Sequence, residues 1–363
     1  MFHSRSLACK KPYGASPAGE PVEFTVYPCR EHSVSRLTLW VEEDGQQAAA
    51  YPMRWFGLVG ARDRYCASFT PPHSGLYWYW FTFDTADGPR FCARGYGGRS
   101  EVLDSMGDRY QLTVYDPAYQ PPRWFGEGIT YNIFPDRFCR DREPVQPEGE
   151  GIAPRVLHEN WDDLPVYRPD EHGEILNNDF FGGTLRGVME KLDYLESLHV
   201  QTIYFNPIFQ AYSNHRYDTG DYKRIDPLLG SDEDFKTLCE QAKKRGMRVV
   251  LDGVFNHTGY DSRYFNGHGR YDSLGAHQSK DSPYYPWFDF SEWPDKYGSW
   301  WGIYTLPQVN ETDGSYQDYI IEDEDSVVRR WLRLGASGWR LDVADELPDS
   351  FIQKLNAAPR REK

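Results

Sequence analysis

The sequence predicts an α/β protein in two parts: an N-terminal antiparallel β-sandwich over residues 1–118, then an incomplete (β/α)8 TIM barrel over residues 119–363. Three observations support this prediction. Short segments that alternate apolar and polar residues fill the first part. Strand and helix patterns then alternate along the second part. Polar clusters follow the strands of that second part, as in barrels whose chemistry lies at the strand C-termini.

The first part is typical of a sandwich because its strand candidates are short and are separated by Gly/Pro turns. These candidates are residues 21–27, 37–41 and 75–83. The segment 115–122 has the proline-rich composition of a linker to the second part.

The second part alternates strands with helices, which predicts a parallel sheet. The expected strands are 129–134, 202–205, 248–254 and 338–342, and the expected helices are 184–198, 232–244 and 323–334. Apolar residues of 184–198 recur on one helical face, and Ser231 with Asp234 forms a capping pair at the start of 232–244. A long segment rich in Gly, Pro, Tyr and Trp, residues 258–318, precedes the third helix.

A closed barrel needs eight strands, whereas four are expected here. Half a barrel leaves an open sheet edge and a bare apolar face. We therefore expect the chain to be a fragment of a longer protein. A genuine four-stranded domain, or two half-barrels that assemble as a dimer, are the alternatives.

Composition and charge exclude several classes of function. The net charge of -15, without a basic run, argues against a nucleic-acid partner. No apolar run marks a signal peptide or a membrane span, and six scattered cysteines without a CxxC pair indicate reduced thiols. A cytoplasmic enzyme is the default expectation. The 16% aromatic content hints at carbohydrate, with an aromatic core as the equal alternative.

Three polar clusters follow successive strands of the second part: 214–218, 252–257 and the pair Arg340/Asp342. Residues two apart on a strand share a face, so Arg340 is expected beside Asp342. A neighbouring guanidinium keeps a carboxylate ionised and oriented, as a nucleophile requires. Each cluster alone has an ordinary structural explanation, such as a turn, a core tyrosine or an ion pair. Three of them at one barrel mouth favour an active site.

These motifs resemble glycoside hydrolase family 13, the α-amylase family, and its neopullulanase-like and maltogenic branch in particular. The family pattern D-x-V-x-N-H is present as Asp252, Val254, Asn256 and His257, and the pattern G-x-R-x-D as Gly338, Arg340 and Asp342. Similar stretches are 133–138, 213–219, 306–310 and 343–346. The resemblance covers residues from about Gly126 to Phe351, and the N-terminal sandwich resembles the module that precedes the barrel in this branch.

The resemblance implies a retaining glycosidase that acts on α-1,4 or α-1,6 bonds of starch, glycogen, pullulan or cyclodextrins. Asp342 would be the nucleophile, and Arg340 would orient it. Roles in the substrate site fall to Tyr217, His215, Asp218, His257, Asp252 and Glu346. Among these, Asp252 would brace Arg340 and Glu346 would face the acceptor subsite. Residues 258–318 would form a small domain inserted after the third strand, with Trp300 and Trp301 near the cleft.

A retaining glycosidase also needs a proton donor about 5 Å from its nucleophile. In the family this donor is a glutamate after the fifth strand, and it has no counterpart here. The carboxylates that follow Asp342 are Asp345, Glu346, Asp349 and Glu362, the last in a polar, strand-free segment. We expect the chain alone to be inactive, with a catalytically silent glucan-binding or truncated product as the alternative.

The resemblance implies no required cofactor, although some members of the family bind calcium. Asn256 and Asp141 are the candidate ligands. Calcium prefers six to eight oxygens, and solvated loop carboxylates are the alternative reading of these residues. The resemblance also implies a homodimer to which the N-terminal module contributes, and it leaves hydrolysis and transglycosylation both open.

Overall fold

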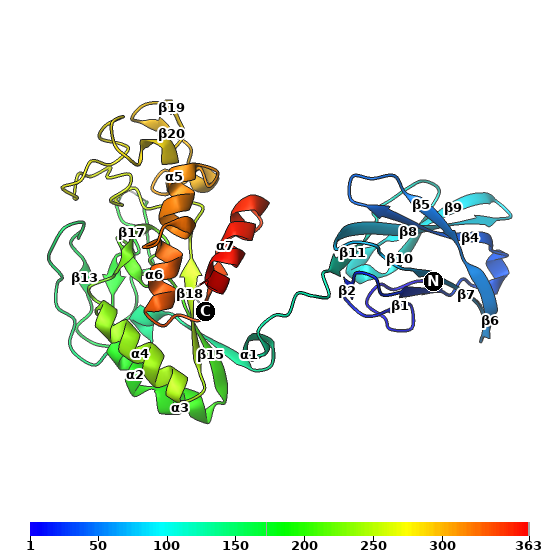
Figure 1. The fold of residues 1–363 in the computed structure, drawn as a ribbon, viewed down its shortest axis with the longest axis horizontal. Coiled ribbons are helices and arrows are strands. Elements are labelled where there is room, and N and C mark those ends of the chain that lie inside the picture. Colours follow the sequence, from blue (N-terminus) through cyan, green and yellow to red (C-terminus); the bar gives the residue numbers. More distant parts are fainter. Residues whose placement is uncertain (172, 362–363) are drawn as a thin grey trace. The chain divides into compact units, whose positions relative to one another are not determined.

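The computed structural model describes residues 1–171 and 173–361. Its compact units are Met1–Pro121 and Pro122–Lys363, shown in Figure 1. The boundary lies between strand β11 (Tyr110–Tyr115) and helix α1 (Arg123–Gly126), within the segment expected to be a linker.

The first unit contains two β-sheets, with strand orders β1-β3-β7-β6 and β10-β9-β8-β11-β2, and β4 and β5 extend the second sheet beside β8. Besides β11, the strands of this unit are β1 (Lys10–Lys11), β2 (Ser16–Pro17), β3 (Val22–Val26), β4 (Ser35–Glu43), β5 (Ala49–Pro52), β6 (Arg54–Val59), β7 (Arg62–Phe69), β8 (Gly75–Thr85), β9 (Gly88–Arg94) and β10 (Ser100–Leu103). Alternate residues of β3 and β11 are buried and join one apolar core with those of β8. The three strands expected in this region are confirmed as β3, β4 and β8.

The second unit contains a parallel sheet with the order β12-β15-β18-β21. Its strands are β12 (Ile129–Ile133), β15 (Val200–Phe205), β18 (Arg248–Gly253) and β21 (Gly338–Leu341), which confirms the four expected strands. β18 is buried along nearly its whole length, whereas the edge strands β12 and β21 are largely exposed or half-buried. Among the described residues, the sheet is open rather than closed into a barrel.

The helices of the second unit confirm one prediction fully and correct two others. Helix α4 (Asp232–Lys244) has the predicted bounds and the predicted capping box. The expected helix 184–198 is wrong as a single element, because it is interrupted at Lys191 between α2 (Leu185–Glu190) and α3 (Leu192–Ser197). Lys191 N–H donates to the Val188 carbonyl three residues back, which closes α2 with a tighter turn.

The expected helix 323–334 begins later than predicted. A π-helical turn, η6 (Asp318–Glu322), comes first, and α6 (Val327–Arg333) follows it. Between them, Ser326 Oγ donates to the Ile321 carbonyl at 3.0 Å, and this side-chain bond replaces a helical one. Helix α7 (Asp349–Arg361) ends the described chain, and Glu362 lies outside the described residues.

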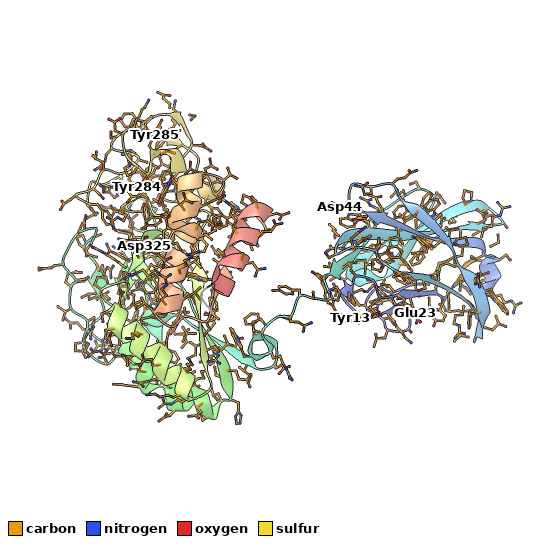
Figure 2. The ribbon with its side chains drawn as sticks, in the orientation of Figure 1. Tyr13, Glu23, Asp44, Tyr284, Tyr285 and Asp325 are labelled. Atoms are coloured by element: carbon orange, nitrogen blue, oxygen red, sulfur yellow. The ribbon has the colours of Figure 1, made fainter. Side chains whose placement is uncertain are left out.

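The connections between the strands of this sheet carry short elements. After β12 come η3 (Pro135–Arg137), β13 (Val156–Leu157) and β14 (Asp179–Phe180), and after β15 come β16 (Phe209–Ala211) and β17 (Thr219–Ile225). After β18 come η4 (Tyr285–Trp287), β19 (Phe290–Glu292), β20 (Lys296–Tyr297), η5 (Trp300–Gly302) and α5 (Gly314–Gln317). The long connection after β18 has its own aromatic packing, in which the Tyr284 ring lies 4.8 Å from that of Trp287 and the Tyr285 ring 5.4 Å from that of Phe290. Figure 2 labels Tyr284 and Tyr285 in this connection. It returns beside its starting point, because Thr258 N–H donates to the Pro307 carbonyl.

Two expectations from composition concern the whole described chain. All six cysteines are free thiols, in agreement with the absence of a disulfide framework. No helix in residues 1–171 or 173–361 has the length and apolar character of a membrane span.

Candidate active site

One guanidinium joins two carboxylates at the ends of adjacent parallel strands. The register pairs Asp252 of β18 with Arg340 of β21, and Asp342 directly follows β21. Arg340 Nη1 donates to Asp342 Oδ1 at 2.6 Å and to Asp252 Oδ1 at 3.0 Å. The structure therefore brings together the three residues that the two motifs singled out. Strand alternation puts Arg340 and Asp342 on one face, and the parallel register supplies Asp252.

Two tyrosine hydroxyls complete the surroundings of Asp252. Tyr204 and Tyr217 both donate to Asp252 Oδ2, Tyr217 at 3.0 Å. Burial raises the pKa of Asp252, while Tyr204, Arg340 and Tyr217 oppose that rise. Burial and the Asp252 charge raise the pKa of Tyr217 to about 12, so its hydroxyl stays protonated near neutral pH. Tyr204 belongs to no recognised motif, and only the β15–β18 pairing reveals its role.

The loop between β16 and β17 holds Tyr217 in place through its own side chains. Ser213 Oγ donates to Asp218 Oδ1, and Ser213 N–H donates to Asp218 Oδ2 at 3.1 Å. Tyr217 N–H donates to His215 Nδ1 at 3.2 Å, which leaves the proton of the neutral ring on Nε2. Burial lowers the pKa of His215. The predicted residues His215, Tyr217 and Asp218 thus form one turn beside the strand ends.

A buried ionic group anchors the loop between β16 and β17. Asp226 accepts two hydrogen bonds of 2.7 Å from Arg155 and one of 3.3 Å from Arg216. The Phe180 ring contacts both guanidinium groups, with centroid distances of 4.5 Å and 5.4 Å. Arg216 lies within the loop, directly before Tyr217, and so connects the group to the site. Sequence reasoning missed Arg155 and Asp226, because neither lies in a motif.

Asn256 and His257, just beyond the end of β18, have buried polar side-chain atoms. Neither ring nitrogen of His257 and neither amide atom of Asn256 makes a hydrogen bond within the described residues. Burial lowers the pKa of His257 to about 4, against the opposing effects of Asp342 and the Tyr217 backbone, so the ring is neutral near neutral pH. Buried polar groups usually have hydrogen-bond partners, so these atoms are available to bind water or a ligand.

Glu346 is held by two tryptophans from the long connection. Trp300 Nε1 donates to Glu346 Oε2 at 2.9 Å, and Trp301 Nε1 donates to Oε1 at 2.8 Å. The two indoles are stacked, with centroids 5.2 Å apart. The turn between Asp342 and Glu346 contains Val343 at φ 45°, a left-handed conformation that a β-branched residue rarely adopts. Backbone strain of this kind is common at functional sites, where the surrounding structure holds the strained residue in place.

The two residues predicted as calcium ligands lie in different settings. Asp141 Oδ1 accepts from Thr184 Oγ1 at 2.6 Å, next to the start of α2, and Arg142 Nη1 lies 3.7 Å from Oδ2. Asn256 lies beyond the end of β18. No group of three or more His, Cys, Asp or Glu residues suited to a metal occurs in the part of the chain that the structure describes. Calcium prefers six to eight oxygen ligands, and calcium at Asp141 or Asn256 stays a prediction.

Comparisons with known proteins place this geometry in a family. The model of the α-amylase catalytic domain matches residues 132–363. An amylopullulanase of Thermoanaerobacter thermohydrosulfuricus is 36% identical over 382 residues, which cover 94% of this chain and 26% of that protein. An intracellular maltogenic amylase of Bacillus subtilis (strain 168) is 33% identical over 328 residues, which cover 88% of this chain and 51% of that protein.

Solved structures agree with these relatives. A cyclomaltodextrinase has a TM-score of 0.60 and 26% identity, and the match covers 98% of this chain and 58% of that one. The type III pullulan hydrolase from Thermococcus kodakarensis has a TM-score of 0.58 and 27% identity, with coverages of 100% and 59%. The chain thus spans about half the length of several relatives, and less of the amylopullulanase. The matched region contains Asp252, Arg340 and Asp342, and the chain belongs to the α-amylase family of glycosidases.

Proposed function

We propose that this chain carries the nucleophile side of a retaining glycosidase site for α-glucans. The observation that carries the proposal is the Arg340 guanidinium shared by Asp252 and Asp342. Arg340 binds Asp342 Oδ1, and Oδ2 accepts no hydrogen bond from the described residues. A carboxylate that is oriented through one oxygen and free at the other suits nucleophilic attack.

The proposed first step forms an ester between Asp342 Oδ2 and the anomeric carbon of the sugar. The bond to the leaving oxygen breaks, that oxygen takes a proton from a general acid, and water later hydrolyses the ester. Arg340 keeps the nucleophile ionised, and Asp252 braces Arg340. His257 would hydrogen-bond a sugar hydroxyl as a neutral ring, Tyr217 would stack beneath the sugar, and His215 and Asp218 would hold Tyr217.

The proposed substrates are α-1,4- and α-1,6-linked glucans such as starch, glycogen, pullulan and cyclodextrins. The names of the relatives, amylopullulanase, maltogenic amylase and cyclomaltodextrinase, support this class. Glu346 would face the acceptor subsite. We propose hydrolysis, which the name of the pullulan hydrolase from Thermococcus kodakarensis supports, with transfer to a sugar as the alternative. We further propose the cytoplasm as compartment, a homodimer as assembly, and residues 258–318 as a small domain inserted into a barrel of which this chain forms the first half.

We propose that the general acid is not among these 363 residues. Of the carboxylates after Asp342, Asp345 and Asp349 are exposed, and both oxygens of Glu346 are bound by indoles. Loss of general-acid help typically slows turnover by about 10²–10⁴-fold. This arrangement also supports a second candidate, a glucan-binding protein without turnover.

The nucleophile can be tested without a general acid, because fluoride leaves without a proton. We expect an α-maltosyl fluoride, with a second ring fluorine that slows hydrolysis, to add one glycosyl unit to the chain in intact-mass measurements. Asp342→Asn should remove the adduct, and Asp345→Asn, the matched control three residues away, should retain it. An adduct that persists in Asp342→Asn would overturn the assignment. No adduct together with calorimetric binding of maltotriose would favour the second candidate.

A further inference from the structure

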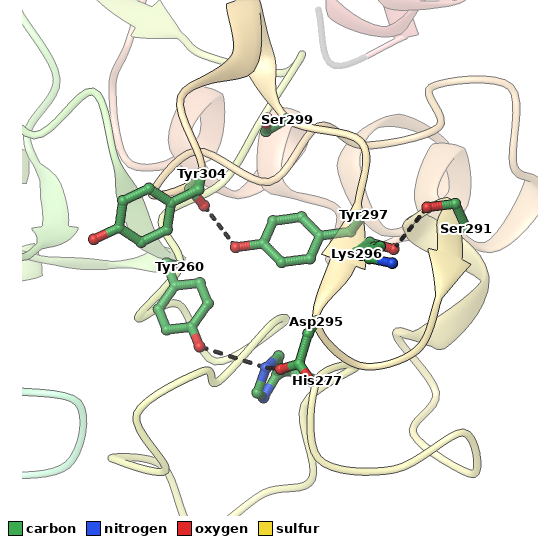
Figure 3. A pocket seen from close by; sticks show the side chains of 8 residues that line it. All are labelled: Tyr260, His277, Ser291, Asp295, Lys296, Tyr297, Ser299 and Tyr304. Carbon is green, nitrogen blue, oxygen red and sulfur yellow. Dashed lines mark hydrogen bonds and ion pairs between the residues drawn. The ribbon is translucent and has the colours of Figure 1, made fainter.

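A concave site lies in the connection after β18, outside the Asp342 network. Its pocket has a volume of about 490 Å³, and Figure 3 shows the side chains around it. Three tyrosines, Tyr260, Tyr297 and Tyr304, line it together with His277, Asp295 and Lys296. The volume lies in the range of small-molecule sites, and the strand-end residues do not take part in the lining.

The walls of this pocket are fixed by contacts among themselves. Tyr297 OH donates to the Tyr304 carbonyl at 2.7 Å, and Tyr260 OH lies 3.4 Å from His277 Nε2 (Figure 3). The Tyr260 ring centroid lies 6.4 Å from those of both Tyr297 and Tyr304. Tyr304 is 65% exposed, although the pocket's other two tyrosines are half-buried. Tyr297 thus fixes the backbone of Tyr304, and the Tyr304 ring, edge-on to Tyr260, is open to solvent and to a ligand.

The charges of the lining favour a neutral ligand. Lys296 Nζ is paired with Glu292 at 2.5 Å, and Asp295 Oδ1 lies 3.9 Å from His277 Nε2. Burial lowers the pKa of His277, so its ring is neutral near neutral pH. The lining therefore has no excess of cations to bind a phosphate or carboxylate. Hydroxyls, an imidazole and one carboxylate are instead the groups that bind a polyol.

The pocket shares a short loop with the candidate active site. Trp300 and Trp301 of η5 bind Glu346, while Ser299 and Tyr304, on either side of them, line the pocket. A ligand in the pocket would thus contact the loop that carries both indoles.

We propose that this pocket is a secondary sugar site that binds a neutral glucosyl unit of an α-glucan. The choice of an α-glucan rests on the proposed function. The tyrosine rings would pack on the apolar face of the sugar, and Asp295, His277 and the serine hydroxyls would bind its hydroxyl groups. The site would hold a glucan chain near the Glu346 side of the active site without taking part in bond cleavage.

Isothermal titration of the chain with maltotriose tests this proposal. We expect two binding events, of which Tyr304→Ala weakens one by about tenfold, equal to about 1.4 kcal/mol. Tyr217→Ala should weaken the other. Tyr194→Ala is the matched control, because Tyr194 is an exposed tyrosine of α3 away from the pocket. Asp295→Asn, a second and isosteric variant, should weaken the same event as Tyr304→Ala, and thermal melting checks that each variant folds.

The outcomes separate this proposal from the proposed function. Unchanged titrations of Tyr304→Ala and Asp295→Asn would overturn the secondary site, whereas the glycosyl adduct on Asp342 would still support the nucleophile. Loss of one event in Tyr304→Ala without any adduct would support the pocket and count against catalysis. Binding of choline in place of maltotriose would identify an aromatic cage for a cation and overturn the sugar assignment.

Discussion

Two of the ionic clusters in the second unit have similar composition and opposite arrangements of charge. The buried cluster, Arg155, Arg216 and Asp226, has two guanidinium groups for one carboxylate, and its side chains are at most 1% exposed. The strand-end cluster, Asp252, Arg340 and Asp342, has one guanidinium for two carboxylates, and Arg340 is 42% exposed.

This difference decides which cluster has a carboxylate oxygen that can react with a substrate. In the buried cluster both oxygens of Asp226 are occupied by arginines, and its pKa is lowered to about 2: burial opposes the shift, and Arg216 and Arg155 overcome it. In the strand-end cluster Arg340 binds one oxygen of Asp342, and the other accepts no hydrogen bond from residues 1–171 or 173–361. A saturated carboxylate anchors a loop, whereas an unsaturated one can attack a substrate.

The largest expected effect is on turnover. In a protein that combines this chain with its general acid, Asp342→Asn should lower kcat on the order of 10⁴-fold or more, equal to about 5.5 kcal/mol. Glucan affinity and the free energy of unfolding should change little, because Asp252 still pairs with Arg340. Steady-state kinetics with a chromogenic maltooligosaccharide measures the first effect and urea unfolding the second. Retained turnover would show that Asp342 is not the nucleophile, and the two clusters would then not differ in function.

The buried cluster should respond in stability instead. Asp226→Asn should lower the free energy of unfolding by about 3–5 kcal/mol, because it leaves two buried guanidinium groups without a counter-charge. Asp193→Asn is a matched control at the surface, where Asp193 is 83% exposed and pairs with Arg245 at 2.8 Å. Its cost should stay within about 1 kcal/mol. Equal costs in urea unfolding would show that burial does not distinguish the two pairs.

The two clusters should also respond oppositely to acid. The lowered pKa of Asp226 contributes stability that is present above its unfolded value of 3.8 and is lost as pH falls towards about 2. The pKa of Asp252 is raised by burial, so protonation of Asp252 favours the folded state as pH falls. As pH falls, the free energy of unfolding of the wild type should therefore decrease relative to that of Asp226→Asn. Over the same range it should increase relative to that of Asp252→Asn. Parallel urea titrations across this pH range test the signs, and equal slopes would contradict them.

A helix cap without an ion pair gives the smallest expected effect and a scale for the effects of the two ionic clusters. Thr184 caps α2 by accepting from Gly187 N–H at 2.9 Å, and it donates to Asp141. Thr184→Ala should lower the free energy of unfolding by about 1 kcal/mol, and Thr184→Ser, which keeps the hydroxyl, should cost less. Thermal unfolding compares the two variants. A loss as large as that of Asp226→Asn would mean that charge is not what makes the buried cluster important.

Local signals predicted much of the second unit. The capping box fixed the bounds of α4, because Ser231 and Asp234 satisfy each other's backbone groups within one turn. Apolar periodicity placed the buried face of 184–198 but could not predict the break at Lys191, since Leu185 and Leu195 remain buried on either side of it. Strand alternation predicted Arg340 beside Asp342, because residues two apart on a strand lie on the same face.

The sequence by itself determined the order of strands and helices along the chain, the family, and the residues of the motifs, because these depend on spacings of a few residues. Only the tertiary structure decided which groups saturate which carboxylates. Arg155 and Asp226 are 71 positions apart, and Trp300 and Glu346 are 46 apart. Hydrogen bonds over such separations depend on how β15, β18 and the long connection pack. The physical reason is that periodicity encodes local geometry, whereas burial and partner choice are properties of the folded chain.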